Sequence, residues 1–394
     1  MSTSWARVQL RDVVDPVQRV EAPVPGTGYR QLGVRLWGEG AYERESVDGG
    51  STKYRVLGRV EADDLVVNKI WARNGSVAVV TPGLAGCYVS GEFPTYAANL
   101  ERISPRWLHW LTKTPGFWAQ CDAKSQGTSG KNRIKPEEFL SVEIPLPPLA
   151  EQQRIVARIE AMAGKFEEMR TLRAITAMEA QALWTGCLRK KIAGSIDREV
   201  PLASVCEAII DNLHSNPRYA ETGIPCVRSP NVGWGTLDLT GALRTDEDEY
   251  ERRTVRGEPR ADDVVLVREG GGTGKAALVA PGDRFSLGQR VMMLRPDKKK
   301  VLPKFFLYQM LSPMVLLDQI RPLSKGSASP HLNIAALKAF RLRVPPLAAQ
   351  QIVVDELDQL SSNLQQLDTE QEQSRIELDA LLPAVLDRAF KGEL

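Results

Sequence analysis

The chain has 394 residues, with 51 Lys and Arg residues against 49 Asp and Glu residues and a hydrophobic fraction of 43%. This length is sufficient for two or three folded domains, and this composition excludes a disordered or fibrous chain. The formal net charge of +2 argues, taken alone, against a strongly basic nucleic-acid binder. An average can, however, hide a segregated distribution of charge.

The cysteines and the first residues of the sequence indicate in which cellular compartment the protein is expected. The five cysteines are scattered and form no C-x-x-C pair, so we expect neither a disulfide framework nor a metal site. The first residues, MSTSWARVQLRDVV, lack the basic and apolar regions of a secretory signal. No apolar run approaches the roughly 18–20 residues that span a bilayer. We therefore expect a cytoplasmic protein with reduced thiols.

An internal repeat is the most informative feature of the sequence. Residues 147–153 (PPLAEQQ) recur as residues 345–351 (PPLAAQQ), at an offset of 198 residues. The same offset still relates Gly194 to Gly392, near the end of the chain. Upstream of these motifs the match is looser and the offset drifts. A repeat of this length indicates two copies of a domain, because solenoid repeats are only about 20–50 residues long.

The repeat divides the chain into four segments. Residues 1–146 and 197–344 are divergent blocks, and the better-matched blocks are residues 147–196 and 345–394. The divergent blocks carry short strand-like runs between turn clusters and a helical stretch late in each block, which is typical of mixed α/β domains. The expected fold class is α+β, with two such domains separated by two long helices.

Both matched blocks predict long helices. Proline stands just inside each start, and apolar residues then follow a 4-3-4-3 spacing that favours helix-on-helix packing over burial in a globular core. We expect the helices to pair antiparallel, with the domains at opposite ends, and we expect Pro383 and Gly186 to break or kink them. The residues expected to form the helix–helix seam and to dock other subunits are Ile155, Ile159, Met162, Phe166, Met169, Val353, Leu357, Leu360, Leu364 and Leu367.

The charge is unevenly divided among the four segments. In chain order their formal charges are +2, +3, +4 and −7. The contrast between the basic first helix and the acidic second helix predicts complementary charges where the two helices meet. Basic loops on the two domains can bind phosphates despite the small net charge of the whole chain.

One glycine-rich segment comes near a phosphate-binding loop. Residues 269–276 (EGGGTGKA) place Glu269 where the motif needs glycine, and they place Ala276 where it needs the hydroxyl that binds magnesium. We therefore interpret the segment as a turn after a strand, from which Lys275 approaches DNA.

No other motif indicates catalysis. Residues 216–219 (NPRY) resemble an amino-methyltransferase signature, but Arg218 replaces its second proline, so we interpret them as a turn. The acidic pairs at residues 63–64 and 262–263 precede strands at matching places and are interpreted as structural. The three histidines are far apart in the sequence, and His109, in an aromatic stretch, is expected to be packed rather than catalytic.

Two motifs carry a resemblance to a known family. Residues 144–156 (IPLPPLAEQQRIV) and 382–394 (LPAVLDRAFKGEL) look like signatures of the specificity (S) subunits of Type I restriction–modification enzymes. Residues 90–94 (SGEFP) and 223–228 (GIPCVR) look like phrases frequent in the target recognition domains of that family. The second repeat departs from the family pattern at Ala349, where Glu is usual. The resemblance covers essentially the whole chain.

The resemblance implies a non-catalytic DNA-reading subunit. Each target recognition domain would read one half of a bipartite sequence in double-stranded DNA, and the paired helices would fix the spacer between the halves. The family also implies two methyltransferase (modification) subunits that bring S-adenosylmethionine. It further implies restriction (translocase and nuclease) subunits that use ATP and Mg²⁺. No cofactor is expected in this chain itself, and neither the target sequence nor the spacer length can be deduced.

Candidate DNA contacts are the polar residues of loops near the domain ends. Two of these loops, residues 125–133 and 324–333, occupy equivalent positions before the two long helices. Arginine pairs with guanine and Asn or Gln with adenine in the major groove. The candidates are Lys124, Ser125, Lys131, Arg133, Arg228, Asn231, Lys275, Lys325, His331 and Asn333.

Two other classes of function are compatible with parts of this pattern. A coiled-coil adaptor without DNA affinity would share the long helices but would show no salt-sensitive binding to DNA. A self-sufficient nucleic-acid enzyme would transfer methyl groups alone, although no cofactor motif supports that reading.

Overall fold

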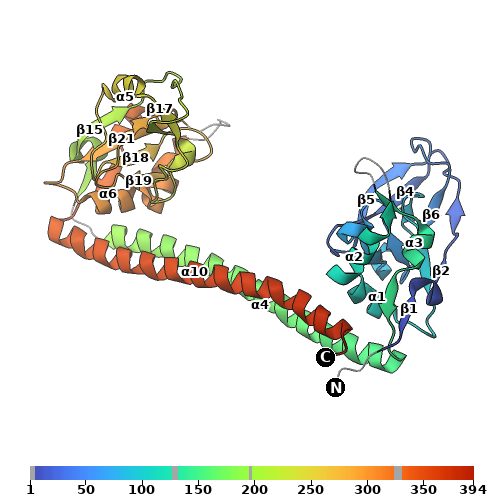
Figure 1. Ribbon diagram of the computed structural model, residues 1–394. Coiled ribbons are helices and arrows are strands. Elements are labelled where there is room, and N and C mark those ends of the chain that lie inside the picture. Colours follow the sequence, from blue (N-terminus) through green and yellow to red (C-terminus); the bar gives the residue numbers. More distant parts are fainter. Residues whose placement is uncertain (1–4, 127–131, 195–197, 324–330) are drawn as a thin grey trace. The chain divides into compact units, whose positions relative to one another are not determined.

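The structure is a computed structural model and describes residues 5–126, 132–194, 198–323 and 331–394. The chain forms two compact units, of which the first consists of Met1–Leu172 with Glu372–Leu394 and the second of Arg173–Gln371. Each unit contains a β-rich domain and parts of two long helices, α4 (Leu149–Gly194) and α10 (Leu347–Phe390) (Figure 1). This architecture confirms the α+β class that the sequence predicts.

The domain of the first unit is built on two sheets and two small ribbons. Its strands are β1 (Arg7–Gln9), β2 (Val14–Pro16), β3 (Val20–Glu21), β4 (Gly28–Val34), β5 (Ala41–Asp48), β6 (Leu57–Arg59), β7 (Leu65–Val67), β8 (Val77–Val79), β9 (Tyr88–Val89), β10 (Thr95–Ala98), β11 (Ser125–Gln126), β12 (Arg133–Ile134) and β13 (Glu143–Pro145). Within the described residues the strand orders are β2-β10-β7-β8 and β3-β6-β9-β4-β5, and β1 pairs with β13 and β11 with β12. Its helices are α1 (Pro105–Leu111), α2 (Pro115–Ala123) and α3 (Pro136–Leu140).

The domain of the second unit repeats the first of these sheets. Its strands are β14 (Glu199–Pro201), β15 (Cys206–Asp211), β16 (Ile224–Val227), β17 (Leu243–Thr245), β18 (Val264–Val267), β19 (Ala276–Leu278), β20 (Ser286–Leu287), β21 (Val291–Pro296) and β22 (Arg341–Arg343). Across the described ranges the orders are β15-β21-β18-β19 and β17-β16-β20, with β14 on β22. Its helical segments are α5 (Glu247–Thr254), α6 (Pro303–Met310), α7 (Pro313–Val315), η6 (Leu316–Ile320), α8 (Arg321–Leu323) and α9 (Ile334–Lys338).

The inner strands β7 and β18 are buried on both faces. Leu65 and Val67 of β7 belong to the main core, whereas Val66 belongs to a second cluster on the opposite face. In β18 the same alternation places Val264 in one core and Val265 in the other. Because successive side chains of a strand point to opposite faces, a continuous apolar run is what such a doubly covered strand requires.

The turns before these strands are also equivalent. Asp64 accepts hydrogen bonds from the backbone N–H of Glu61 and from Arg19. Asp263 accepts them from the backbone N–H of Arg260 and from a different arginine, Arg295. Both carboxylates are buried inside turns, which agrees with a structural role for the acidic pairs.

In the structure, the offset of 198 residues also relates elements that lie upstream of the repeated sequence motifs. Strands β13 and β22 are related by this offset, and so are helices α3 and α9 and the first residues of α4 and α10. The first strands of the two domains, β1 and β14, are instead separated by 192 residues. The equivalence therefore holds at the junction with the long helices and drifts toward the start of each domain.

A buried glutamine fastens each long helix to its domain. Gln152 accepts a hydrogen bond from the N–H of Ser104 at 2.8 Å, and it donates to the carbonyl oxygens of Arg102 and Pro147. Gln350 forms the corresponding three hydrogen bonds with the residues 198 positions later, which are Leu302, Lys300 and Pro345. The glutamine repeated in PPLAxQQ is thus a structural connector.

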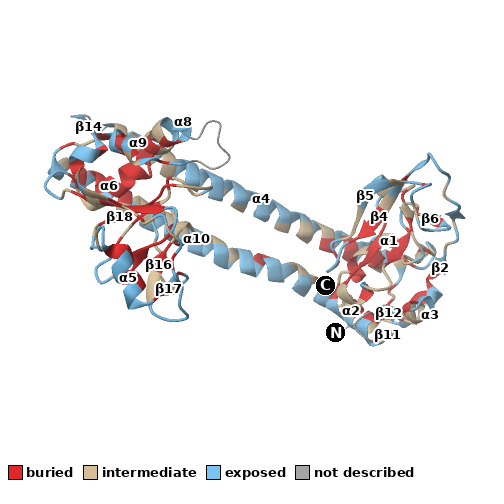
Figure 2. Cartoon of the chain, turned by 90° about the horizontal axis from the view of Figure 1, so that it is seen from above, coloured by how far each residue is buried: buried red, intermediate tan, exposed pale blue. Residues whose placement is uncertain are grey.

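Apart from Leu378 of α10, the described residues of the long helices are fully buried only where they meet a domain (Figure 2). In the first unit Ile155 and Ile159 of α4 join the domain core together with Leu386 of α10. In the second unit Leu188 of α4 and Leu357 of α10 do the same. Between these ends the seam positions are half-buried at Met162, Phe166, Leu360, Leu364 and Leu367, and the side chain of Met169 is 44% exposed. Val353, the remaining expected seam residue, is buried in the second core.

The two helices pair antiparallel within each unit. Arg170 contacts Asp379 at 3.1 Å in the first unit, and Lys191 contacts Glu356 at 2.6 Å in the second. These ion pairs provide the complementary charges that the charge contrast predicts. Asp358, by contrast, contacts Lys304 of α6 at 3.1 Å and is therefore part of the domain junction.

The expected breaks at Gly186 and Pro383 were wrong. Helix α4 runs through Gly186, and α10 runs through Pro383 without interruption. Helix residues beyond both positions are buried in a domain core, including Leu188, Leu386 and Ala389. Their burial offsets a cost of about 1 kcal/mol for glycine and about 3 kcal/mol for proline in a helix. No helix within the described ranges is both long and apolar enough to cross a membrane.

Candidate nucleic-acid interface

A buried arginine stands where strands β15 and β18 of the second domain end. Arg268 follows β18 directly and is only 5% exposed. Its Nη1 donates to both carboxylate oxygens of Asp211, the last residue of β15, at 2.6 Å. Its Nη2 donates to Nε2 of His331 at 3.0 Å, and Nε2 of His214 donates to Asp211 at 2.8 Å. Although burial opposes ionisation, Arg268 and His214 hold the pKa of Asp211 below its usual range.

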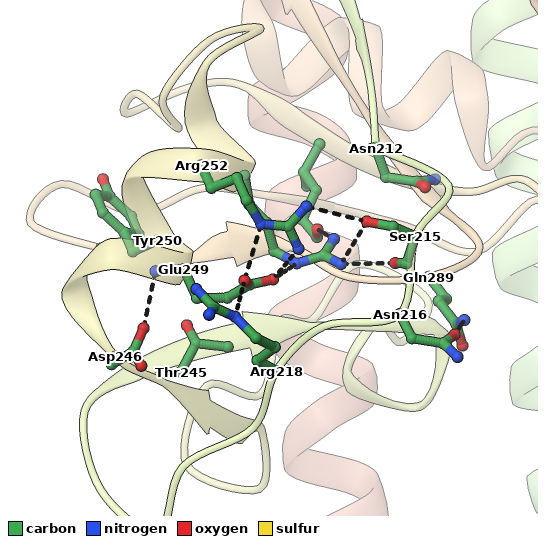
Figure 3. A network of polar contacts seen from close by, with 12 residues as sticks. Asn212, Ser215, Asn216, Arg218, Thr245, Asp246, Glu249, Tyr250, Arg252 and Gln289 are labelled. Carbon is green, nitrogen blue, oxygen red and sulfur yellow. Dashed lines mark hydrogen bonds and ion pairs between the residues drawn. The ribbon is translucent and has the colours of Figure 1, made fainter.

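A second network fixes the loop that follows β15 (Figure 3). Glu249 of α5 is fully buried and accepts hydrogen bonds from Arg218, Arg252 and Arg253 at 2.6–3.1 Å. Burial alone would raise its pKa, but the three guanidinium groups lower that pKa to about 2. Arg253 also donates to the backbone carbonyl of Ser215 at 2.6 Å, which ties the loop to α5.

The NPRY segment is part of this loop and is structural. Arg218 donates to Glu249, and Asn216 accepts a hydrogen bond from Gln289. Residues 212–219 contain no helix or strand. This finding agrees with the turn that the sequence analysis assigned to the segment.

In the first domain the structure brings together two of the predicted contacts. Ser125 and Arg133 lie on the antiparallel ribbon β11–β12, and Lys124 ends helix α2 directly before it. Arg133 is exposed and its Nε lies 3.5 Å from Glu92, whereas the hydroxyl of Ser125 donates to the carbonyl of Cys121. Lys131 lies outside the described residues.

In the second domain the predicted contacts are spread over several elements. His331 is exposed and belongs to the network of Arg268, and Lys275 is half-buried at the start of β19. Asn333 caps helix α9 by accepting from the N–H of Ala336 at 2.7 Å. Lys325 lies outside the described residues.

The structure argues against one of these contacts. Asn231, at the end of a short 3-10 turn (Ser229–Asn231), is 6% exposed and accepts from the N–H of Arg228 at 3.0 Å. It is therefore a capping residue. The guanidinium of Arg228 is placed over the ring of Tyr219, 5.6 Å from its centroid.

Other polar groups of the candidate interface were missed from the sequence. Asp211, Arg268 and Arg290 meet only through the sheet, because they end or begin different strands. One signal was present: the aligned runs DDLVVNK and DDVVLVR place Lys69 and Arg268 at equivalent positions after β7 and β18.

His109 and the cysteines do not contribute to this interface. Burial, with a smaller contribution from Lys113 and Arg106, lowers the pKa of His109 to about 3, so this packed side chain is neutral near pH 7. The five cysteines are all free thiols. Burial raises the pKa of the thiols of Cys121 and Cys206 to about 12, which makes them unreactive.

Comparison with solved structures identifies the class of fold. The HsdS subunit from Thermoanaerobacter tengcongensis superimposes with a TM-score of 0.65, 24% identity and coverage of 100% of this chain and 98% of that one. A chain from a type I R-M system, studied for complex assembly and conformational transition, gives a TM-score of 0.75 at 22% identity and covers 100% and 99% of the two chains. The fold is therefore that of a Type I specificity subunit.

Sequence comparisons identify the family. Residues 260–378 match the family described as Type I restriction modification DNA specificity domain. The EcoBI specificity subunit of Escherichia coli is 24% identical over 307 residues, which cover 71% of this chain and 64% of that protein. The EcoKI subunit of E. coli strain K12 is 23% identical over 309 residues, with coverage of 72% and 64%. The chain thus matches less than two thirds of the length of these relatives. Residues 260–378 thus carry the DNA specificity domain of this family, and the chain is similar to Type I restriction–modification specificity (S) subunits.

Proposed function

We propose that this protein is the non-catalytic subunit that selects the DNA target of a Type I restriction–modification complex. Each of the two domains, residues 1–146 and residues 197–344, reads one half of a bipartite site in double-stranded DNA. The helices of residues 147–196 and 345–394 set the spacer. The observation that carries this proposal is that two domains share a core sheet and a helix junction but differ in the polar residues at equivalent strand ends.

The difference between the domains fits the reading of two unlike half-sites. Lys69 and Arg268 follow the equivalent strands β7 and β18, and Arg133 and His331 are related by the offset of 198 residues. Contacts to bases must differ where the bases differ, whereas contacts to the backbone and to protein partners can be the same. Lys124, Ser125, Lys275, Arg228 and Asn333 remain further candidates for contacts at the rim.

Two apolar grooves support the docking of two copies of one partner. In the second unit a groove of about 830 Å³ lies between α4 and α7–η6, lined by residues that include Thr185 and Pro313. In the first unit a groove of about 420 Å³ lies between α10 and α2, lined by residues that include Pro383 and Pro115. Thr185 corresponds to Pro383, and Pro115 to Pro313, at the offset of 198 residues. We therefore assign the docking of the two methyltransferase subunits to these grooves.

The grooves replace part of the docking face expected from the heptad spacing. Ile155 and Ile159 are fully buried in the first core and cannot contact another subunit. Met178, which lines the groove of the second unit, is 73% exposed. In the proposed complex the methyltransferase subunits bring S-adenosylmethionine, and restriction subunits bring ATP and Mg²⁺.

A domain exchange tests the proposed function. Residues 1–146 are replaced by the corresponding segment of another S subunit, and the chimera is expressed with the methyltransferase subunits. Mapping of methylated adenines in the host DNA should give a motif changed in one half and unchanged in the other. A motif with both halves unchanged would refute the assignment of one half-site to each domain. A chain that binds no duplex DNA in a salt-sensitive manner would instead favour the adaptor function.

A further inference from the structure

The ends of β15 and β18 enclose a polar pocket. The proposed function does not by itself say which DNA base, if any, the residues of this pocket contact. The pocket has a volume of about 230 Å³. It is lined by Asn212, His214, Arg268, Glu269, Gln289 and Arg290. Arg268 forms its buried base, and its Nε is buried without a hydrogen-bond partner in the described part of the chain. A buried donor without a partner is costly, so the pocket is suited to an acceptor from outside.

Backbone strain is concentrated at the rim of this pocket. Five non-glycine residues of the described chain have positive φ angles, and two of them, His214 at 57° and Arg290 at 65°, line the pocket. This conformation costs about 1–3 kcal/mol for each such residue and persists where the surroundings enforce it. Two hydrogen bonds hold the backbone of these segments in place. The side chain of Asn212 donates to the carbonyl of Val291, and the N–H of Arg268 donates to the carbonyl of Arg290.

The side chain of Arg290 is held at the rim with its donors available. It is exposed, and none of the hydrogen bonds and ion pairs found among the described residues involves its guanidinium group. Gly270, which has a φ of 90°, lies beside it, since a Cβ there would be in ordinary van der Waals contact with its Nη1 at 3.5 Å. Arg290 is therefore held at the rim through its backbone, and its side chain is exposed.

The first domain presents an opposite charge at the equivalent position. The N–H of Lys69 donates to the carbonyl of Glu92, as the N–H of Arg268 does to Arg290. The N–H of Ile134 donates to the carbonyl of Lys69, as the N–H of Leu332 does to Arg268. These matching hydrogen bonds superimpose the two strand ends and place Glu92 where the second domain has Arg290. The scaffold is the same, but a carboxylate replaces a guanidinium.

We propose that Arg290 reads a guanine in the half-site of the second domain, with Arg268 as the residue that positions it. The inference rests on the proposed function and deepens it. Arginine donates two hydrogen bonds to O6 and N7 of guanine in the major groove, whereas a carboxylate accepts from N4 of cytosine. Arg268, fixed by Asp211 and His331, holds the strand ends and the carbonyl of Arg290 in place. The reversal at Glu92 gives the first domain a different preference at the corresponding base.

The test measures base preference in the assembled complex. The full chain, with its methyltransferase subunits and S-adenosylmethionine, is incubated with DNA duplexes whose half-site positions are randomised, and methylated adenines are mapped by sequencing. The variant Arg290→Gln should reduce the preference for guanine at one position of one half-site by roughly 5- to 150-fold. The other half-site should be unchanged. Arg290→Lys keeps the charge and can still donate to O6 and N7, but it lacks the rigid planar pair of donors, so it should retain a weaker preference for guanine.

A matched variant and three outcomes decide the question. Lys298→Gln also removes one positive charge, but Lys298 pairs with Asp262 at the opposite end of β18, and this variant should keep the wild-type motif. Arg290→Gln with an unchanged motif would overturn the proposal. So would an Arg290→Gln variant that lowers methylation equally for all four bases at that position, because a phosphate contact carries no base preference. A wild-type complex without any bipartite motif would refute the proposed function itself, which is a separate result.

Discussion

At the scale of single residues, the second domain depends on a buried carboxylate surrounded by arginines. Glu249 and Arg253 are both fully buried, and their ion pair has an N–O distance of 2.8 Å. Such a pair adds little over a well-packed apolar pair, but removal of one partner leaves a buried charge without compensation. Glu249 therefore secures the loop next to Arg290 rather than contacting DNA.

We predict that Glu249→Gln destabilises the protein by about 3–5 kcal/mol, because it leaves Arg253 without its counter-ion. The pKa of Glu249 is about 2 in the folded state, against an ordinary value of 4.5. The carboxylate thus contributes its full stabilisation above about pH 4.5, and this contribution is lost as the pH falls toward 2. Thermal unfolding of the full chain should show a lower Tm for the variant, with a difference from wild type that shrinks below about pH 4.5.

Glu247→Gln is the control for this prediction. Glu247 belongs to the same helix and contacts Arg284, but both side chains are more than half exposed. An exposed ion pair contributes at most about 1 kcal/mol. Equal destabilisation by the two variants, or a pH-independent effect of Glu249→Gln, would contradict the assigned role of Glu249.

Sequence analysis predicted some of these residues but not their associations. His331 was selected because its loop precedes a long helix, and the structure places it against Arg268. Arg290 was not selected, since it stands in no motif and reaches the pocket only through the pairing of β21 with β18. The same reason hid Gln152 and Gln350, whose repetition was visible while their hydrogen-bond partners, some fifty residues away, were not.

At the scale of elements, the long helices are strongly anchored at their ends and weakly covered between them. Within the described residues of α4, none between Ile159 and Leu188 is fully buried. The same is true of α10 between Leu357 and Leu378. A pair of helices can cover only one face of each, so this middle part has fewer buried contacts than the parts inside the domain cores.

We predict that amide hydrogen exchange distinguishes these parts. In α4, residues 163–187 should exchange faster than the segments around Ile159 and Leu188, because local opening there exposes less apolar surface. In α10, residues 360–377 should exchange faster than the segments around Leu357 and Leu386. Mass spectrometry of peptic fragments of the full chain measures both helices in one experiment. Uniform protection along α4 would show that the half-buried seam is as stable as the domain cores.

The helices also show what a sequence pattern can and cannot determine. Proline at the start and the 4-3-4-3 spacing predicted the helices, because both signals are local. The antiparallel pairing followed instead from the repeat, which separates the two equivalent helices by a domain. The breaks predicted at Gly186 and Pro383 were wrong, because the local penalty is smaller than the gain from burying Leu188 and Leu386 in cores that are distant in sequence.

At the scale of the whole molecule, the duplication gives two equivalent grooves on a chain with two different reading domains. The charged positions that correspond in the two grooves, Arg189 and Asp387, have opposite signs. Each is neutralised locally, since Arg189 contacts Asp318 at 3.6 Å and Asp387 contacts Lys391 at 2.7 Å. The same partner surface can therefore bind in both grooves despite the contrast in charge between the long helices.

We predict that each groove can be blocked separately. Gly186 lines the groove of the second unit and Gly116 that of the first, and both have open space where a side chain would project. Gly186→Arg should therefore leave the fold intact, fill its groove and reduce the number of bound methyltransferase subunits from two to one. Gly116→Arg should do the same at the other groove, and the double variant should bind none.

The mass of the assembled complex, measured by analytical ultracentrifugation, reports these numbers directly. Gly164→Arg is the matched control, because Gly164 is an exposed glycine of α4 with open space beside it and lies outside both grooves. This variant should still bind two methyltransferase subunits. Two bound subunits on the double variant would exclude the grooves as docking sites. One bound subunit on each single variant would show that the duplication provides two independent sites for one partner.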